Sequence, residues 1–123
     1  MTALQKKNLN MWMNRLMAWV LIFASFFALS FKAYAADITM GSGGNLVFEP
    51  NEITISAGDT VTFTNGDLPP HNMQVADHSE LSHGDLAFTA GERFDVTFPE
   101  AGDYNIQCDP HAGAGMKGVI HVS

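Results

Sequence analysis

Residues 36–123 of this 123-residue chain predict an all-β sandwich, and two patterns carry the prediction. Short runs of β-branched and aromatic residues recur at close spacing, separated by turn-forming Gly, Asp and Pro residues. In several runs apolar and polar residues alternate, which is the pattern of a strand with one buried face. The predicted strands cover residues 37–40, 52–56, 60–65, 72–76, 93–98, 103–108 and 118–122.

Alternation within the runs also predicts the core. In residues 60–65, Val61 and Phe63 share one face and the threonines share the other. In residues 93–98 the inward set is Phe94, Val96 and Phe98. Residues 77–86 are polar, lack a strand pattern and have room for one helical turn. The remaining predicted core residues are Phe48, Ile53, Ile55, Phe88, Ile106, Ile120 and Val122.

Residues 1–35 have the features of a secretory signal peptide. Lys6, Lys7 and Arg15 form a basic region, residues 16–31 form an apolar run, and Ala33-Tyr34-Ala35 is a small-x-small cleavage site. The alternative is a membrane anchor, but the run is short for a span of about 20 residues and the cleavage site follows at once. We predict a signal peptide over 1–35 and one domain over 36–123, exported unfolded because no twin-arginine pair precedes the run.

The predicted domain is strongly acidic and contains one cysteine. All thirteen acidic residues lie within 36–123, against Arg93 and Lys117 as the only cations, so the domain carries a net charge of −11. Such a surface repels nucleic acid and anionic membranes and favours a partner with a basic face. Cys108 cannot form an internal disulfide, and burial or a bound metal would protect its thiol in an oxidising compartment.

One loop near the C-terminus predicts a metal site. Cys108-Asp-Pro-His111-Ala-Gly-Ala-Gly-Met116 offers a thiolate, an imidazole and a thioether, and His71 in Pro-Pro-His-Asn-Met lies in a second loop. Two histidines, a cysteine and a weak axial methionine form a blue-copper electron-transfer site. The alternative is a buried free cysteine beside a surface histidine. Three soft or borderline ligands within nine residues favour copper.

Other residues are assigned no metal-binding role. His78, His83 and His121 are expected to be solvated, and Met40 and Met73 are expected in strands or in the core. A copper enzyme needs an open coordination position, which four protein ligands do not leave, so no enzyme activity is predicted. A copper-storage protein would carry exposed Met or His clusters, and the sequence contains none.

The chain resembles the plastocyanin family over nearly all of residues 36–123. The matching segments are Gly44-Asn-Leu-Val-Phe-Glu-Pro, Gly58-Asp-Thr-Val-Thr-Phe-Thr-Asn, Pro69-Pro-His-Asn and the Cys108–Met116 loop continued by Lys-Gly. This resemblance implies an eight-stranded Greek-key sandwich with copper under one end. It implies that the ligands are His71, Cys108, His111 and Met116, and that Asn72 tunes the Cys108 sulfur through its amide and braces the ligand loops through its side chain.

The resemblance also implies a function. The protein would be a soluble, monomeric one-electron carrier in the thylakoid lumen, accepting electrons from cytochrome f of the cytochrome b6f complex and delivering them to photosystem I. It would dock transiently through an apolar patch around His111. The patch residues are Gly44, Leu46, Pro70, Gly113 and Ala114. The alternative is a pseudoazurin-like or halocyanin-like donor to a respiratory enzyme.

Three departures from the family pattern affect docking and not ligation. The segment 76–86 is short, and this segment carries part of the acidic docking patch in plant members. Gln107 stands where the family usually has a tyrosine, and Ala112 stands where many cyanobacterial members have an arginine. These departures put a remote electron route and the electrostatics of docking in doubt.

Overall fold

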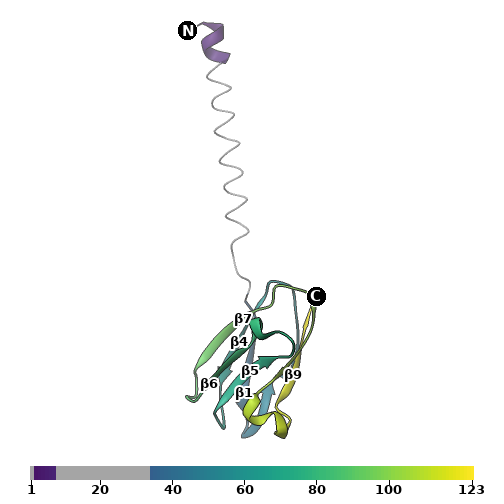
Figure 1. Cartoon of the computed structure of the whole chain (residues 1–123). Helices are drawn as coiled ribbons and strands as arrows, with labels where there is room; N and C mark the ends of the chain where they lie inside the picture. The colour runs from purple at the N-terminus through teal and green to yellow at the C-terminus, as the bar shows by residue number, and fades with distance from the viewer. Residues whose placement is uncertain (1, 8–33) are drawn as a thin grey trace. The chain divides into compact units, whose positions relative to one another are not determined.

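The computed structural model describes residues 2–7 and 34–123. Residues 3–7 are helical, and residues 34–123 form a β-sandwich (Figure 1). Most of the predicted signal peptide lies outside the described residues. Among the residues that are described, no helix is long and apolar enough to cross a membrane.

Residues 34–123 contain nine strands and two short 3-10 helices, arranged in two sheets. One sheet has the order β2-β1-β4-β7, and the other has the order β3-β9-β8-β5-β6. The elements are β1 Tyr34–Ser42, β2 Asn45–Glu49, β3 Glu52–Ile55, β4 Thr60–Asn65, β5 His71–Val75, η1 Ser79–Leu81, β6 His83–Ala87, β7 Arg93–Thr97, β8 Gly102–Gln107, η2 Asp109–Ala114 and β9 Lys117–Val122.

The predicted all-β sandwich is confirmed, with nine strands in place of the eight implied by the family resemblance. The seven predicted strands are all present, and β2 and β6 are additional. Both are edge strands with few buried residues, so their sequences lack the alternation that marks a half-buried strand. The short helix η1 corresponds to the helical turn that the sequence allows within the polar segment 77–86.

The core lies between the two sheets and is centred on β4. Val61 and Phe63 of this strand have no exposed surface. Thr60 and Thr62 occupy the opposite face, as predicted, yet they are also buried because β4 lies between β1 and β7. The Thr62 hydroxyl donates to Asp95 of β7 over 2.7 Å. The other apolar residues with at most 2% exposure are Ile38, Met40, Phe48, Met73, Phe98, Ile106, Cys108, Met116 and Ile120.

The prediction that Phe88 belongs to the core is wrong. Its side chain is 65% exposed, and it follows edge strand β6, which has a neighbour on one side only. The buried side chain of Asn65 donates from Nδ2 to the carbonyl groups of Ala87 and Thr89, at 3.1 and 3.0 Å. These two bonds fix the backbone on both sides of Phe88 while its ring remains exposed.

Strand ends bring two distant segments of the chain together. β5 begins at His71 and pairs with β8, where Gln74 lies opposite Gln107. β8 ends one residue before Cys108, and β9 begins one residue after Met116. Because Gln107 also pairs with Lys117, the loop that contains η2 is closed between adjacent strands.

Candidate metal centre

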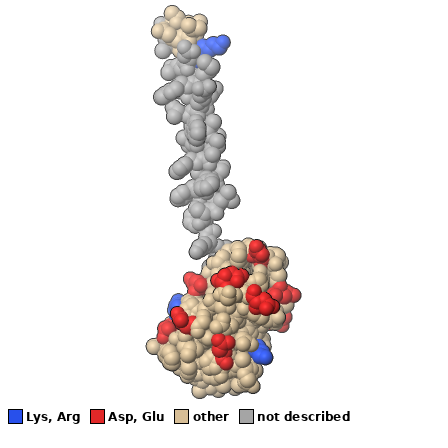
Figure 2. Space-filling model, viewed as in Figure 1, with Lys and Arg blue, Asp and Glu red and all other residues tan. Residues whose placement is uncertain are grey.

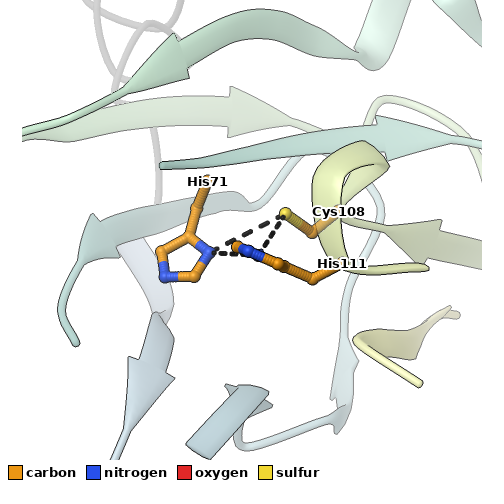
Figure 3. A group of neighbouring side chains, drawn as sticks. All are labelled: His71, Cys108 and His111. Carbon is orange, nitrogen blue, oxygen red and sulfur yellow. Dashed lines mark hydrogen bonds between the residues drawn. The ribbon is translucent and has the colours of Figure 1, made fainter. Parts of the chain in front are cut away.

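Three side chains converge where β5 meets the η2 loop. The Nδ1 atoms of His71 and His111 lie 3.2 Å apart, and the Cys108 Sγ lies 3.8 Å from the first and 3.6 Å from the second (Figure 3). A point equidistant from these three atoms lies about 2 Å from each, which is the length of a bond between a metal and an imidazole nitrogen. Within the described residues, this is the only His, Cys, Asp and Glu group with the spacing of a metal site.

The structure fixes the tautomer of His71. Its buried imidazole donates from Nε2 to the carbonyl oxygen of Asp67 over 2.6 Å. With the proton on Nε2, the Nδ1 lone pair is free to point at the other two donor atoms. This assignment is what a neutral histidine ligand requires.

The thiol of Cys108 is enclosed by the loop that carries it. Its residue is fully buried, and burial raises the pKa of the thiol. Hydrogen bonding from the Asn72 backbone lowers this pKa, which agrees with the tuning role that the family resemblance implies for Asn72. Because burial dominates, a cation at this site is needed to hold the sulfur as a thiolate at neutral pH.

His111 is the partly exposed member of the group. Burial of its ring, followed by the proximity of His71, lowers the pKa of His111. Both influences favour the neutral imidazole, the form in which its Nδ1 can bind a metal. The rings of the two histidines meet edge-on, with centroids 5.1 Å apart and an interplanar angle of 65°.

Met116 ends the same loop and has no exposed surface. Its carbonyl accepts from the Cys108 amide over 3.1 Å, and its own amide donates to the His111 carbonyl over 3.2 Å. These bonds place the methionine beside both loop donors through the backbone. Ligation by the thioether remains a prediction.

Asn72 connects the two segments that carry the donors. Its Oδ1 accepts from the Asp109 amide at 2.8 Å, while its Nδ2 donates to the Asp109 carboxylate at 3.1 Å and to the Gly84 carbonyl at 3.0 Å. Gln74 also donates to this carboxylate, at 3.0 Å, and these amide donors, Asn72 first, lower the pKa of Asp109. The predicted bracing by Asn72 is present, whereas the sequence does not predict the part played by Asp109.

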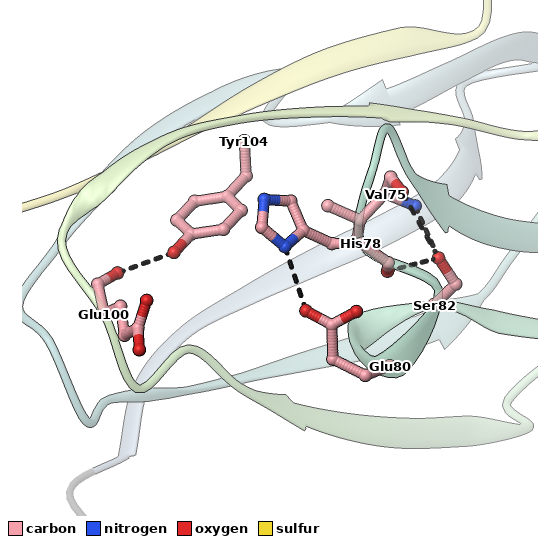
Figure 4. Close-up of polar contacts among 6 residues, drawn as sticks. All are labelled: Val75, His78, Glu80, Ser82, Glu100 and Tyr104. Carbon is pink, nitrogen blue, oxygen red and sulfur yellow. Dashed lines mark hydrogen bonds and ion pairs between the residues drawn. The ribbon is translucent and has the colours of Figure 1, made fainter.

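The remaining histidines lie outside this group, and His83 departs from the expectation that all three are solvated. His83 is half-buried, and its ring stacks on Phe94 with centroids 3.8 Å apart. His78 bonds Glu80 at 2.9 Å, and its ring centroid lies 5.0 Å from that of Tyr104 (Figure 4). His121, whose side chain is 36% exposed, has a carboxylate partner on each ring nitrogen.

The fold and the donor set define a cupredoxin, a β-sandwich class that holds copper for electron transfer. The family model "copper binding proteins, plastocyanin/azurin family" matches residues 35–123, which is most of the chain. The chain therefore belongs to the plastocyanin/azurin family of copper-binding proteins. Copper is accordingly the cofactor, and the imidazole, imidazole and thiolate donors found here suit it.

Similar proteins agree with this assignment. A chloroplastic plastocyanin of barley (Hordeum vulgare) is 41% identical over 101 residues, covering 75% of this chain and 65% of the barley protein. A plastocyanin of Scenedesmus fuscus is 45% identical over 98 residues, covering 70% of this chain and 99% of that protein. The oxidised plastocyanin of the fern Dryopteris crassirhizoma superimposes with a TM-score of 0.65 at 29% identity, covering 72% of this chain and 100% of the other.

Proposed function

We propose that this protein is a one-electron carrier whose copper ion is bound by His71, Cys108, His111 and Met116. The convergence of three donor atoms from β5 and the η2 loop is the observation that supports the proposal. Bound copper supplies the Cu(I)/Cu(II) couple. The protein holds the donors in one arrangement, because the closed loop and the Asn72 contacts oppose their movement, and a rigid site needs little rearrangement when an electron arrives or leaves.

The same donor set favours a carrier over an enzyme. A metal that catalyses a reaction keeps a position open for water or substrate. Here three donors surround one point, and a fourth candidate, Met116, is buried on the same loop. Substrate would have to displace one of these side chains, whereas an electron needs only a short path to the surface.

His111 provides that path in this proposal. It is the only member of the donor group that is not buried, and the small residues Gly113 and Ala114, two and three positions further along the chain, are exposed. Gly44, in the turn before β2, is exposed, and Leu46 of β2 and Pro70, which precedes β5, are half-buried. All five residues of the predicted patch therefore have accessible surface. A small apolar contact of this kind suits brief docking, in which partners bind weakly and separate quickly.

The proposed partners are cytochrome f of the cytochrome b6f complex, as donor, and photosystem I, as acceptor. The proposed location is the lumenal side of the thylakoid, reached after cleavage of a signal peptide over residues 1–35. Similarity to plastocyanins, one of them chloroplastic, supports this assignment over a pseudoazurin-like or halocyanin-like donor to a respiratory enzyme. The acidic surface adds support for a basic partner, and Figure 2 shows Asp and Glu scattered over the visible face of the sandwich, with few Lys or Arg.

An optical spectrum of the Cu(II)-loaded protein tests the metal centre. We expect an intense blue colour from the Cys108 thiolate-to-copper transition, and Cys108→Ser should abolish it. Met116→Leu should keep the colour and raise the reduction potential, because an axial ligand tunes the site without creating the colour. A colourless wild-type protein with one copper per chain would refute the proposed site.

A further inference from the structure

Asp67, in the loop between β4 and β5, bonds both the His71 side chain of the candidate metal centre and the turn between β1 and β2. Its carbonyl accepts the 2.6 Å bond from His71 Nε2, and its amide donates to the Gly41 carbonyl over 2.9 Å. Its carboxylate Oδ2 accepts from the Gly44 amide, also over 2.9 Å. One exposed residue thus connects a predicted ligand to the turn between β1 and β2, which includes part of the apolar patch.

Two glycines allow this connection. Gly41 has φ +82°, and a Cβ there would lie 1.9 Å from the Asp67 carbonyl oxygen and 2.6 Å from His71 Nε2. Gly66 precedes Asp67, and a Cβ at that position would lie 2.3 Å from the Gly41 carbonyl oxygen. Backbone therefore packs directly on backbone here, which leaves the Asp67 carbonyl little freedom to move away from the imidazole.

Leu68 provides an independent sign that this loop is held in place. Its φ is +56°, in the left-handed region that non-glycine residues rarely adopt, and its apolar side chain is 49% exposed. Such a backbone conformation persists only where the surrounding structure enforces it. The three bonds of Asp67 come directly before Leu68 and can supply that constraint.

We propose that Asp67 is a positioning residue that couples the turn between β1 and β2 to the His71 imidazole. Its carboxylate holds the turn through Gly44, and its carbonyl fixes the tautomer and orientation of His71. This inference rests on the proposed copper-carrier function. It predicts that freeing the Gly44 amide also loosens the imidazole, although the carboxylate of Asp67 bonds Gly44 and only its backbone carbonyl bonds the ring.

Hydrogen exchange measured by NMR on the diamagnetic Cu(I) protein tests the coupling. A lost bond to a charged group permits about tenfold faster exchange, so Asp67→Ala should accelerate the Gly44 amide by about that factor. The His71 Nε2 proton should accelerate in parallel. Asp67→Asn keeps an acceptor oxygen without the charge and should restore slow exchange at both protons.

Asp59→Ala is the matched control. Asp59 precedes β4, at the opposite end of the strand from Asp67, and its Oδ2 accepts from the Ser56 amide at the same 2.9 Å. This variant should accelerate Ser56 and leave Gly44 and His71 unchanged. If Asp67→Ala does not fold, Asp67→Glu provides the test, because it keeps the charge, displaces the acceptor by one methylene and should also accelerate both protons.

The outcomes separate this inference from the proposed function. Faster exchange at Gly44 with no change at the His71 proton would overturn the coupling, and so would no change at Gly44. Exchange can be measured on the copper-free protein as well, so it decides the role of Asp67 even if the Cu(II) form proves colourless. Comparison of reduction potentials adds a second readout: Asp67→Ala and Asp67→Asn lose the same charge, so only altered positioning makes their potentials differ.

Discussion

At the scale of single residues, the side chain of Asn72 should contribute strongly to the free energy of unfolding. It is 2% exposed, and both ends of its amide are occupied by groups from other segments, namely Asp109 and Gly84. Its removal would take away three hydrogen bonds, to the Asp109 amide, the Asp109 carboxylate and the Gly84 carbonyl. A hydrogen bond contributes about 1 kcal/mol to stability, and one to a charged group contributes about 1.5–3 kcal/mol.

We therefore expect Asn72→Ala to lower the free energy of unfolding by roughly 2–4 kcal/mol, measured by urea denaturation. Asn45→Ala is the control, because Asn45 is exposed and its side chain makes one bond, of 3.2 Å, to the nearby Gly43 carbonyl. That variant should change the free energy by less than about 0.5 kcal/mol. Equal losses in the two variants would show that the connection between the ligand segments contributes nothing.

Residue chemistry explains which parts of the site the sequence predicts. Residues with sulfur or imidazole donor atoms can be recognised as candidate metal ligands from their type and spacing. The sequence therefore predicts His71, Cys108 and His111, and these three side chains do converge in the structure. It does not predict the roles of Asp67 and Asp109, because these depend on backbone groups whose positions follow from the fold. A loop aspartate has many ordinary uses in turns, and only the folded backbone shows what it contacts.

At the scale of elements, the outer surface of one sheet carries a cluster that responds to pH. His121 of β9 lies between two neighbouring strands, with Nε2 2.6 Å from Glu52 and Nδ1 2.7 Å from Asp103. The hydrogen bonds to these carboxylates, Glu52 first, raise the pKa of His121. The imidazolium thus joins β3, β9 and β8 across the sheet.

A raised pKa in the folded state stabilises the fold only while the histidine is protonated. The contribution is fully present below about pH 6.5, the ordinary pKa of histidine, and is lost as pH rises through the raised value. The difference in urea midpoint between wild type and His121→Gln should therefore shrink from pH 6 towards pH 9. Glu49→Gln, on the other sheet, is the control, and a difference that grows with pH would contradict the assignment.

Elements also differ in how clearly their sequences predict them. β8 buries Tyr104 and Ile106 in alternation, and β4 buries every residue except the half-buried Thr64. Their sequence patterns are therefore strong and predict their positions within a residue or two. β6 buries only its last residue, and the polar character of residues 77–86 does not indicate that a strand there pairs with β5. Pairing of this kind depends on backbone hydrogen bonds, which the sequence does not display.

At the scale of the whole molecule, acidic charge and the apolar patch should act at different distances. Residues 36–123 carry thirteen acidic and two basic side chains. At physiological ionic strength salt screens such charges beyond about 8 Å, so electron transfer to a basic partner should slow as salt rises. Flash kinetics of partner reduction at increasing ionic strength measures this, and a flat profile would contradict it.

Two variants separate the contribution of the apolar patch from that of the acidic charge. Gly113→Glu places a charge and bulk in the patch and should slow transfer at every salt concentration, because it blocks close contact. The double variant Asp77→Asn with Glu80→Gln should lower the rate only modestly, since eleven acidic residues remain. A collapse of the rate in the double variant would place docking on the 77–80 segment instead of the patch.

The parallel pairing of β3 with β9 determines when the molecule can fold. Ile53 lies opposite Ile120, and Ile55 lies opposite Val122, so two segments more than sixty residues apart complete one sheet. Ser123 then closes the pairing, with its amide donating to the Ile55 carbonyl. Contacts between such distant segments form slowly and cannot form before the ribosome has released the last strand. Because β9 lies between β3 and β8, this sheet stays divided until residues 117–122 have been made, and only then can the sandwich be completed.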